Sequence, residues 1–211
     1  MKFFKENKLI SIVGLLIVFV LFFSLSNNNS APPTNLPLKS SGPIIAFGDS
    51  LVVGVGSSQT RGGFVTRLEN KLGIEIINAG VSGNTTRDGL ARLESDVLSK
   101  NPKLVIISLG GNDYLKRLPS EESTSNLNQI VSRIHQTGSA VILLGVKTGI
   151  VSDASKKIFG DVVGNHNPIY IENILGGIIF NDELMADAIH PNDDGYDIFT
   201  DKIISILGII L

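Results

Sequence analysis

The sequence predicts an α/β domain built on a parallel β-sheet with helices on both of its faces. Short apolar runs recur along the chain, and each is continuous, as in strands that are covered on both faces. Stretches with a helical spacing of apolar residues separate these runs. Several runs end in glycine-rich turns, and in such sheets ligands bind beyond the carboxyl ends of the strands.

The first half of the domain holds two predicted strands and two predicted helices. Residues 43–47 (PIIAF) form a short apolar run that is typical of a buried strand. Residues 64–72 have apolar side chains at 64, 65, 68 and 72, which is a helical spacing. Residues 74–77 predict a second strand, and residues 87–99 predict a second helix with one apolar side.

The second half repeats this alternation. Residues 104–109 (LVIISL) predict a third buried strand. The remaining predicted elements are a helix at 125–136, strands at 141–144 and 169–171, and an amphipathic helix at 194–207. Residues 146–166 have the weakest pattern, and we expect a short helix there around 154–159.

The composition excludes several classes of protein. The chain has 211 residues, of which 43% are hydrophobic, which is enough for one α/β domain with a sizeable core and an additional short segment. It has no cysteine, so disulfides, thiolate metal sites and a lipoprotein anchor are excluded. The first eight residues hold three lysines and one glutamate, which leaves a net charge of −4 on the rest. This mildly acidic body argues against nucleic-acid binding.

Residues 1–26 predict a membrane anchor or a signal segment. Residues 9–25 carry no charge and are just long enough to span a membrane as a helix. Lysines on their N-terminal side predict that this end stays in the cytoplasm and that the body is exported. A cleaved signal peptide is the alternative, with Ser24-Leu25-Ser26 as a tolerable small-x-small site. Either places the body outside the cytoplasm, in the periplasm or the extracellular space.

A polar segment separates this apolar stretch from the predicted domain. Residues 27–42 (NNNSAPPTNLPLKSSG) are rich in Asn, Ser and Pro and predict a flexible linker. The folded domain is therefore expected over residues 43–211.

A serine follows the first predicted strand, in Gly48-Asp49-Ser50. At a strand-to-helix turn its side chain is exposed at the sheet edge, and its amide lies where negative charge is favoured. A serine is a poor nucleophile until a histidine takes its proton, and the histidine needs an acid to fix its tautomer. An ordinary helix N-cap is the alternative that Asp49 and Ser50 leave open.

An acid and a histidine lie near the C-terminus, in Asp187-Ala188-Ile189-His190. Of the three histidines, His190 alone has an Asp three residues before it, and that Asp can lie beside the ring if the loop curls back. Pro191 biases His190 toward an extended backbone rather than a helix. A simple turn before the last helix is the alternative.

Two further turns follow predicted strands and offer hydrogen-bond donors. Gly110-Gly111-Asn112-Asp113 follows the third strand, and the Asn112 amide could point at a developing oxyanion. Residues 78–84 form a similar turn after the second strand, with the Gly83 amide as a second donor. Ordinary turn chemistry is the alternative for both. His135 and His166 have no partner at a ligand spacing, so we expect a surface or helix-dipole-capping role for His135 and no metal site.

The order of these residues resembles the SGNH, or GDSL, hydrolases over roughly residues 43–207. Four blocks carry the resemblance: Gly48-Asp49-Ser50-Leu51, Ser82-Gly83-Asn84-Thr85, Gly110-Gly111-Asn112-Asp113 and Asp187-Ala188-Ile189-His190-Pro191. Within the family the chain looks most like the small bacterial enzymes with thioesterase, arylesterase and lysophospholipase activity, which Gly89-Leu90-Ala91-Arg92-Leu93 supports. The chain departs from them at residues 146–149 and onward to His166, which leaves the acyl length open.

The resemblance implies a flavodoxin-like three-layer α/β/α sandwich with a five-stranded parallel sheet. It implies Ser50 as nucleophile, His190 as general base and then acid, and Asp187 as the orienting acid. It implies an oxyanion hole formed by the amides of Ser50 and Gly83 and the side chain of Asn112. No cofactor or metal is implied, and Asp49 and Asp113 are expected to hold loops by hydrogen bonds.

The leading hypothesis is a serine esterase of acyl esters or thioesters, with a small-molecule or lipid-derived substrate and a membrane contact through the N-terminal segment. A carbohydrate O-acetyl esterase that acts on envelope or extracellular polysaccharide is the alternative within enzymes. A catalytically silent binding module is the alternative from another class. The oligomeric state is not indicated by the sequence.

Overall fold

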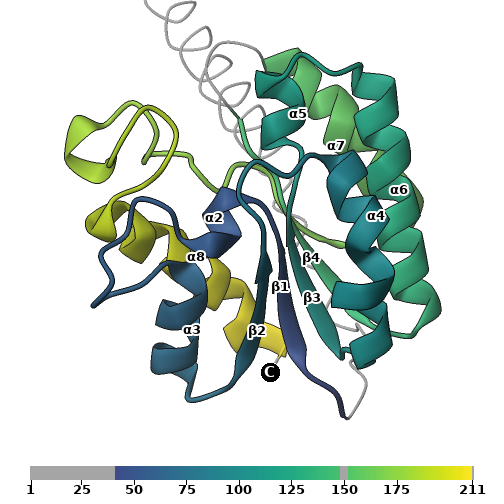
Figure 1. Ribbon diagram of the computed structural model, residues 1–211, viewed down its shortest axis with the longest axis horizontal. Helices are drawn as coiled ribbons and strands as arrows, with labels where there is room; N and C mark the ends of the chain where they lie inside the picture. The colour runs from purple at the N-terminus through teal and green to yellow at the C-terminus, as the bar shows by residue number, and fades with distance from the viewer. Residues whose placement is uncertain (1–40, 148–151, 211) are drawn as a thin grey trace, which may run out of the picture. The chain divides into compact units, whose positions relative to one another are not determined.

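The computed structural model describes residues 41–147 and 152–210. Its centre is a parallel sheet with the order β2-β1-β3-β4-β5 (Figure 1). The strands are β1 (Ile44–Gly48), β2 (Ile76–Gly80), β3 (Leu104–Ser108), β4 (Ala140–Leu144) and β5 (Ile169–Ile171). All four neighbouring pairs are parallel, so the prediction of a five-stranded parallel sheet is confirmed. The order is that of flavodoxin-like folds, in which the direction of winding reverses between β1 and β3.

Helices cover both faces of this sheet (Figure 1). The helices are α2 (Ser50–Val53), α3 (Phe64–Leu72), α4 (Thr86–Asp96), α5 (Gly111–Leu115), α6 (Ser120–Gln136), α7 (Ser152–His166) and α8 (Asp193–Ile210), with 3₁₀ turns η1 (Leu98–Lys100) and η2 (Asp182–Leu184). Buried side chains of α3 and α8 pack in one core cluster, and those of α4, α6 and α7 pack in another. These two clusters fill the two spaces between the sheet and the helical layers on its two faces.

The strand sequences explain why there are two cores. In β1, Ile44 and Ala46 belong to the cluster with α3 and α8, whereas Ile45 and Phe47 belong to the other. Alternate residues of a strand point to opposite faces, so a strand buried on both faces must be apolar throughout. Every residue of β1, β3 and β4 is buried, which matches their continuous apolar sequences.

Some element boundaries differ from the predictions. The second strand begins at Ile76 rather than 74 and continues through Asn78 to Gly80, where a turn was expected. This strand lies at the sheet edge, where its half-exposed residues need not be apolar. Helix α6 begins at Ser120, five residues before the predicted start. The prediction missed these residues because the first turn is polar and shows no apolar spacing. The short helix expected at 154–159 is part of the longer α7.

The predictions for the N-terminal segment, residues 1–26, lie outside the described residues, as does nearly all of the predicted linker, 27–42. Over residues 41–147 and 152–210, no helix is both long and apolar enough to cross a membrane. The domain boundaries at 26 and 42 therefore stay predictions.

Candidate active site

Ser50 lies where the chain turns from β1, an inner strand of the sheet, into α2. Gly48 ends the strand so close to β3 that a Cβ there would lie 2.1 Å from the carbonyl oxygen of Ser108. Asp49 then caps α2, because its Oδ1 accepts a hydrogen bond from the Leu51 amide at 3.1 Å. Ser50 is the first residue of α2 and is partly exposed at the carboxyl edge of the sheet.

His190 and Asp187 meet Ser50 from the loop before α8. His190 Nε2 lies 2.9 Å from Ser50 Oγ, although the two residues are 140 positions apart. His190 Nδ1 lies 2.8 Å from Asp187 Oδ2. The other carboxylate oxygen of Asp187 accepts the amides of Ile189 and His190, both at 2.9 Å. The hydrogen bond from His190 and those backbone donors hold the pKa of Asp187 down at about 2, so it is ionised at neutral pH.

The loop that carries His190 is closed by its own backbone. The Ala186 amide donates to the His190 carbonyl at 2.9 Å, and Met185 and Pro191 form an antiparallel bridge. The Asn192 amide donates to the Leu184 carbonyl at 2.9 Å. The segment from 184 to 192 is therefore one tight unit that leads directly into α8.

Asn112 lies on α5, just beyond the end of β3, beside the turn that holds Asp49. Its Nδ2 donates to the Asn84 carbonyl at 3.0 Å and, at a long 3.4 Å, to Asp49 Oδ2. The structure thus brings Ser50, His190, Asp187 and Asn112 together around the reversal point between β1 and β3.

Gly83 lies next to Asn84 but is not among the residues that line the cleft around Ser50. Its backbone φ is +78°, a left-handed conformation that favours glycine, and nothing lies within 4 Å of where a Cβ would be. Its carbonyl accepts a hydrogen bond from Lys116 Nζ at 2.8 Å. The role of its amide as an oxyanion donor stays a prediction.

Two buried acids hold the turns around this site, as expected. Asp113 accepts the Thr86 amide at 2.9 Å and the Ser123 hydroxyl at 2.8 Å, which joins the starts of α4 and α6 to α5. Asp49 is 3% exposed, and burial raises its pKa to about 6 despite the Leu51 amide, which lowers it.

An open cleft lies beside Ser50. Ser50, Asn112 and His190 supply polar groups, and most of the remaining wall is apolar. The apolar lining residues are Leu51, Leu115, Val146, Leu175, Ile179 and Ile189. Leu175 and Ile179 come from the loop after β5 and were not predicted from the sequence, although the apolar run ILGGIIF at 174–180 is a visible signal.

The two other histidines lie together on α6 and α7, away from this cleft. The rings of His135 and His166 are 6.1 Å apart and meet edge to face. His135, expected as a surface or dipole-capping histidine, lies in the last turn of α6 with its ring partly buried. Its Nε2 has no hydrogen-bond partner among the described residues, and burial lowers its pKa. Over those same residues, no cluster of three or more metal-binding side chains occurs.

Comparisons with known proteins agree on one family. Residues 46–198 match the model of the GDSL-like Lipase/Acylhydrolase family. The chain is 30% identical over 162 residues to "Esterase TesA" of Pseudomonas aeruginosa, which covers 70% of this chain and 79% of that protein. It is 30% identical over 189 residues to "Arylesterase" of Vibrio mimicus, which covers 85% of this chain and 90% of that protein.

A shorter match and two solved structures add to this. The chain is 45% identical over 55 residues to "Acetylxylan esterase" of Geobacillus stearothermophilus, but this covers only 26% of this chain and 25% of that protein. The crystal structure of TesA superposes with a TM-score of 0.74 at 26% identity, over 80% of this chain and 99% of that one. The crystal structure of AlinE4, an SGNH-hydrolase family esterase, superposes with a TM-score of 0.62 at 28% identity. This match covers 81% of this chain and 94% of that one.

Proposed function

Because the chain belongs to the GDSL-like lipase/acylhydrolase family, an enzyme family that acts on ester bonds, we propose that it hydrolyses acyl esters or thioesters with Ser50 as the nucleophile. The observation that carries this proposal is the chain of contacts from Asp187 through His190 to Ser50, at 2.8 and 2.9 Å. Membership of a hydrolase family also sets aside the hypothesis of a silent binding module.

The proposed reaction has two halves. Ser50 Oγ attacks the carbonyl carbon of the substrate while His190 Nε2 takes its proton. Asp187 keeps the other ring proton on Nδ1 and stabilises the imidazolium that forms. The tetrahedral intermediate then collapses, His190 gives the proton to the leaving alcohol or thiol, and Ser50 is left acylated. A water molecule, activated by His190, repeats these steps and releases the acid.

Charge develops on the substrate oxygen in each half. We assign its stabilisation to the Ser50 and Gly83 amides and to the Asn112 side chain, and removing one such donor typically costs about 2.7–4 kcal/mol of transition-state stabilisation. Asn112 lines the same cleft as Ser50, which supports its role. Its 3.4 Å contact with Asp49 is long for a hydrogen bond, so an oxyanion can compete for that N–H.

The apolar wall of the cleft supports an acyl group as the part of the substrate that is bound there. Six aliphatic side chains surround the polar groups, and burying each CH₂ of an acyl chain against them contributes about 0.8 kcal/mol. The polar groups that a sugar needs are few in this lining. A carbohydrate O-acetyl esterase stays the second candidate because of the acetylxylan esterase match.

We further propose that the domain works outside the cytoplasm, on the strength of the uncharged run at 9–25 and the lysines before it. Residues 1–26 would act as an uncleaved anchor or as a cleaved signal. An uncleaved anchor leaves a full-length protein that stays in membranes during an alkaline wash. A cleaved signal leaves a shorter protein that is free of the membrane or released by the wash.

Hydrolysis of p-nitrophenyl esters from acetate to palmitate tests the proposed function. Ser50→Ala is expected to abolish turnover, whereas Ser82→Ala, which removes an exposed serine of the neighbouring turn, should stay within threefold of wild type. Activity that survives in Ser50→Ala contradicts the proposal. Activity on acetylated xylo-oligosaccharides with none on chains of six carbons or longer favours the second candidate.

A further inference from the structure

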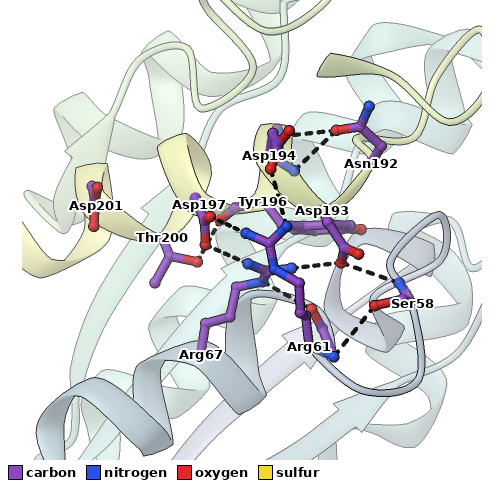
Figure 2. Close-up of polar contacts among 12 residues, drawn as sticks. Ser58, Arg61, Arg67, Asn192, Asp193, Asp194, Tyr196, Asp197, Thr200 and Asp201 are labelled. Atoms are coloured by element: carbon purple, nitrogen blue, oxygen red, sulfur yellow. Dashed lines mark hydrogen bonds and ion pairs between the residues drawn. The ribbon is translucent and has the colours of Figure 1, made fainter. Parts of the chain in front are cut away.

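A buried arginine joins the segment after the nucleophile to the segment after the histidine. Arg67, on α3, is only 6% exposed, and all three of its nitrogens are used (Figure 2). Its Nη2 donates to Asp193 Oδ1 at 2.7 Å, its Nη1 to Asp197 Oδ1, and its Nε to the Gly62 carbonyl at 2.9 Å. Arg61 also binds the start of α8: its Nη2 donates to Asp197 Oδ2, and its Nη1 donates to Asp194 Oδ1 at 3.0 Å. We call these five charged residues the α3–α8 clamp.

The clamp closes directly beside the loop of His190. Asp193 is the first residue of α8 and follows His190 by three positions. Its Oδ1 also accepts the amide of Ser58 at 3.1 Å, from the loop that leads from α2 to α3. In Figure 2, Arg67 and Arg61 both reach across to the first turns of α8.

The loop between α2 and α3 touches the His190 segment at two further points. The Tyr196 hydroxyl donates to the Val55 carbonyl at 2.9 Å. Gly56 packs so tightly that a Cβ there would lie 2.4 Å from the Pro191 carbonyl oxygen and 3.1 Å from His190 Cβ. The clamp therefore holds the loop between α2 and α3, which continues from Ser50, against the start of α8, which continues from His190.

Asp187 cannot set the distance between His190 and Ser50. It belongs to the same closed loop as His190, so it orients the ring but moves with it. That distance depends instead on how the loop and the start of α8 are held against the segment that follows Ser50. Arg67 is the most deeply buried member of the contact that holds them.

We infer that Arg67 is a positioning residue, which acts through Asp193 and Asp197 to keep His190 Nε2 within hydrogen-bond distance of Ser50 Oγ. This inference rests on the proposed roles of Ser50 and His190. A displacement of about 1 Å between reacting groups can cost about 100-fold in rate. Loss of the clamp is therefore expected to lower kcat while leaving the apolar wall, and so KM, nearly unchanged.

The test compares two ion pairs on the same pair of helices. Arg67→Met removes the clamp, and Lys71→Met removes the Lys71–Asp201 pair one turn farther from His190, where Nζ lies 2.6 Å from Oδ1. Each full-length variant is assayed for kcat and KM on a p-nitrophenyl ester. The rate at which a phosphonate ester modifies Ser50 reports the reactivity of the serine separately, and thermal unfolding reports stability.

We expect Arg67→Met to lose 10- to 100-fold in kcat and in phosphonate reactivity with KM within threefold, and Lys71→Met to stay within twofold in all three. Arg67→Lys should recover part of the loss. A folded Arg67→Met protein with kcat within twofold of wild type overturns the inference and leaves the proposed function standing. If Arg67→Met does not fold, Asp193→Asn takes its place in the test. We expect that variant to lose at least fivefold in kcat, and a wild-type kcat would overturn the inference. An inactive wild-type protein would instead remove the proposed function itself.

Discussion

Asp187→Asn removes one charge but keeps the shape of the side chain. Two backbone amides, those of Ile189 and His190, donate to Oδ1 at 2.9 Å, while Oδ2 lies 2.8 Å from His190 Nδ1. An asparagine keeps both backbone bonds only if its carbonyl replaces Oδ1, so its NH₂ group faces His190 Nδ1. That nitrogen must then accept, and the ring proton moves to Nε2, which faces Ser50. A ring in this tautomer cannot take the serine proton.

Two terms set the size of the expected loss. The opposite rotamer of the introduced asparagine restores the productive tautomer but loses two backbone hydrogen bonds, at about 1–3 kcal/mol in total. Since 1.4 kcal/mol is a factor of ten, the productive form falls by roughly 5- to 150-fold. The missing charge would cost about 4 kcal/mol at 4 Å and an effective dielectric constant near 20. The Asp187 side chain is 52% exposed, so solvent reduces this to about 2 kcal/mol. Together these terms predict a loss of roughly 10²- to 10⁴-fold in kcat.

The assay measures kcat and KM separately on a p-nitrophenyl ester near pH 7.5. Asp182→Asn, a change of the same kind at an exposed position five residues earlier, is the matched control and should stay within twofold of wild type. A folded Asp187→Asn protein whose kcat is within tenfold of wild type would refute the tautomer argument.

Two further predictions concern stability and the close contact beside His190. Because burial raises the pKa of Asp49 from 3.8 to about 6, its contribution to stability is complete below pH 3.8 and is lost as the pH rises through 6, by about 3 kcal/mol in total. The free energy of unfolding, measured in urea from pH 4 to 8, should show this decline in wild type and not in Asp49→Asn. The same pH dependence in both proteins would contradict the prediction. Gly56→Ala should lower kcat at least tenfold by displacing the His190 loop, whereas Gly73→Ala, where φ is +64° but no atom lies within 4 Å of the added Cβ, should lose stability alone. Equal kcat values in the two glycine variants would show that the loop absorbs the added methyl group.

The buried strands could be predicted from the sequence because their apolar runs are continuous. Helix α3 has the predicted bounds, since its apolar spacing runs from its first residue to its last. The start of α6 was missed because Ser120 to Thr124 has no apolar periodicity, although Pro119 and two glutamates are a signal for a helix start. The short helices α2 and α5 have too few residues for any period to show.

The candidate site was predictable where a turn follows a strand and not where distant loops meet. Ser50 and Asn112 could be placed at the carboxyl edge of the sheet from the strands before them. The apolar wall from Leu175 and Ile179 could not, because the apolar run at 174–180 indicates burial but not which surface it covers. The α3–α8 clamp could not be predicted for the same reason. The spacing of Asp193 and Asp197 is visible in the sequence, but their pairing with Arg67 depends on which helices are neighbours.

The place along the chain of the proposed nucleophile and the proposed base has a consequence for when the enzyme becomes active. Ser50 follows β1, the first strand along the chain, and His190 precedes the last helix, α8. This helix packs through Phe199 on Phe64 of α3, with ring centres 5.0 Å apart. Domains generally fold as units, and this one is complete only when its last helix is present. A growing chain that exposes Ser50 therefore has no base to activate it until α8 has docked. Esterase activity during refolding should accordingly appear only once α8 has docked, and it can serve as a direct measure of that docking.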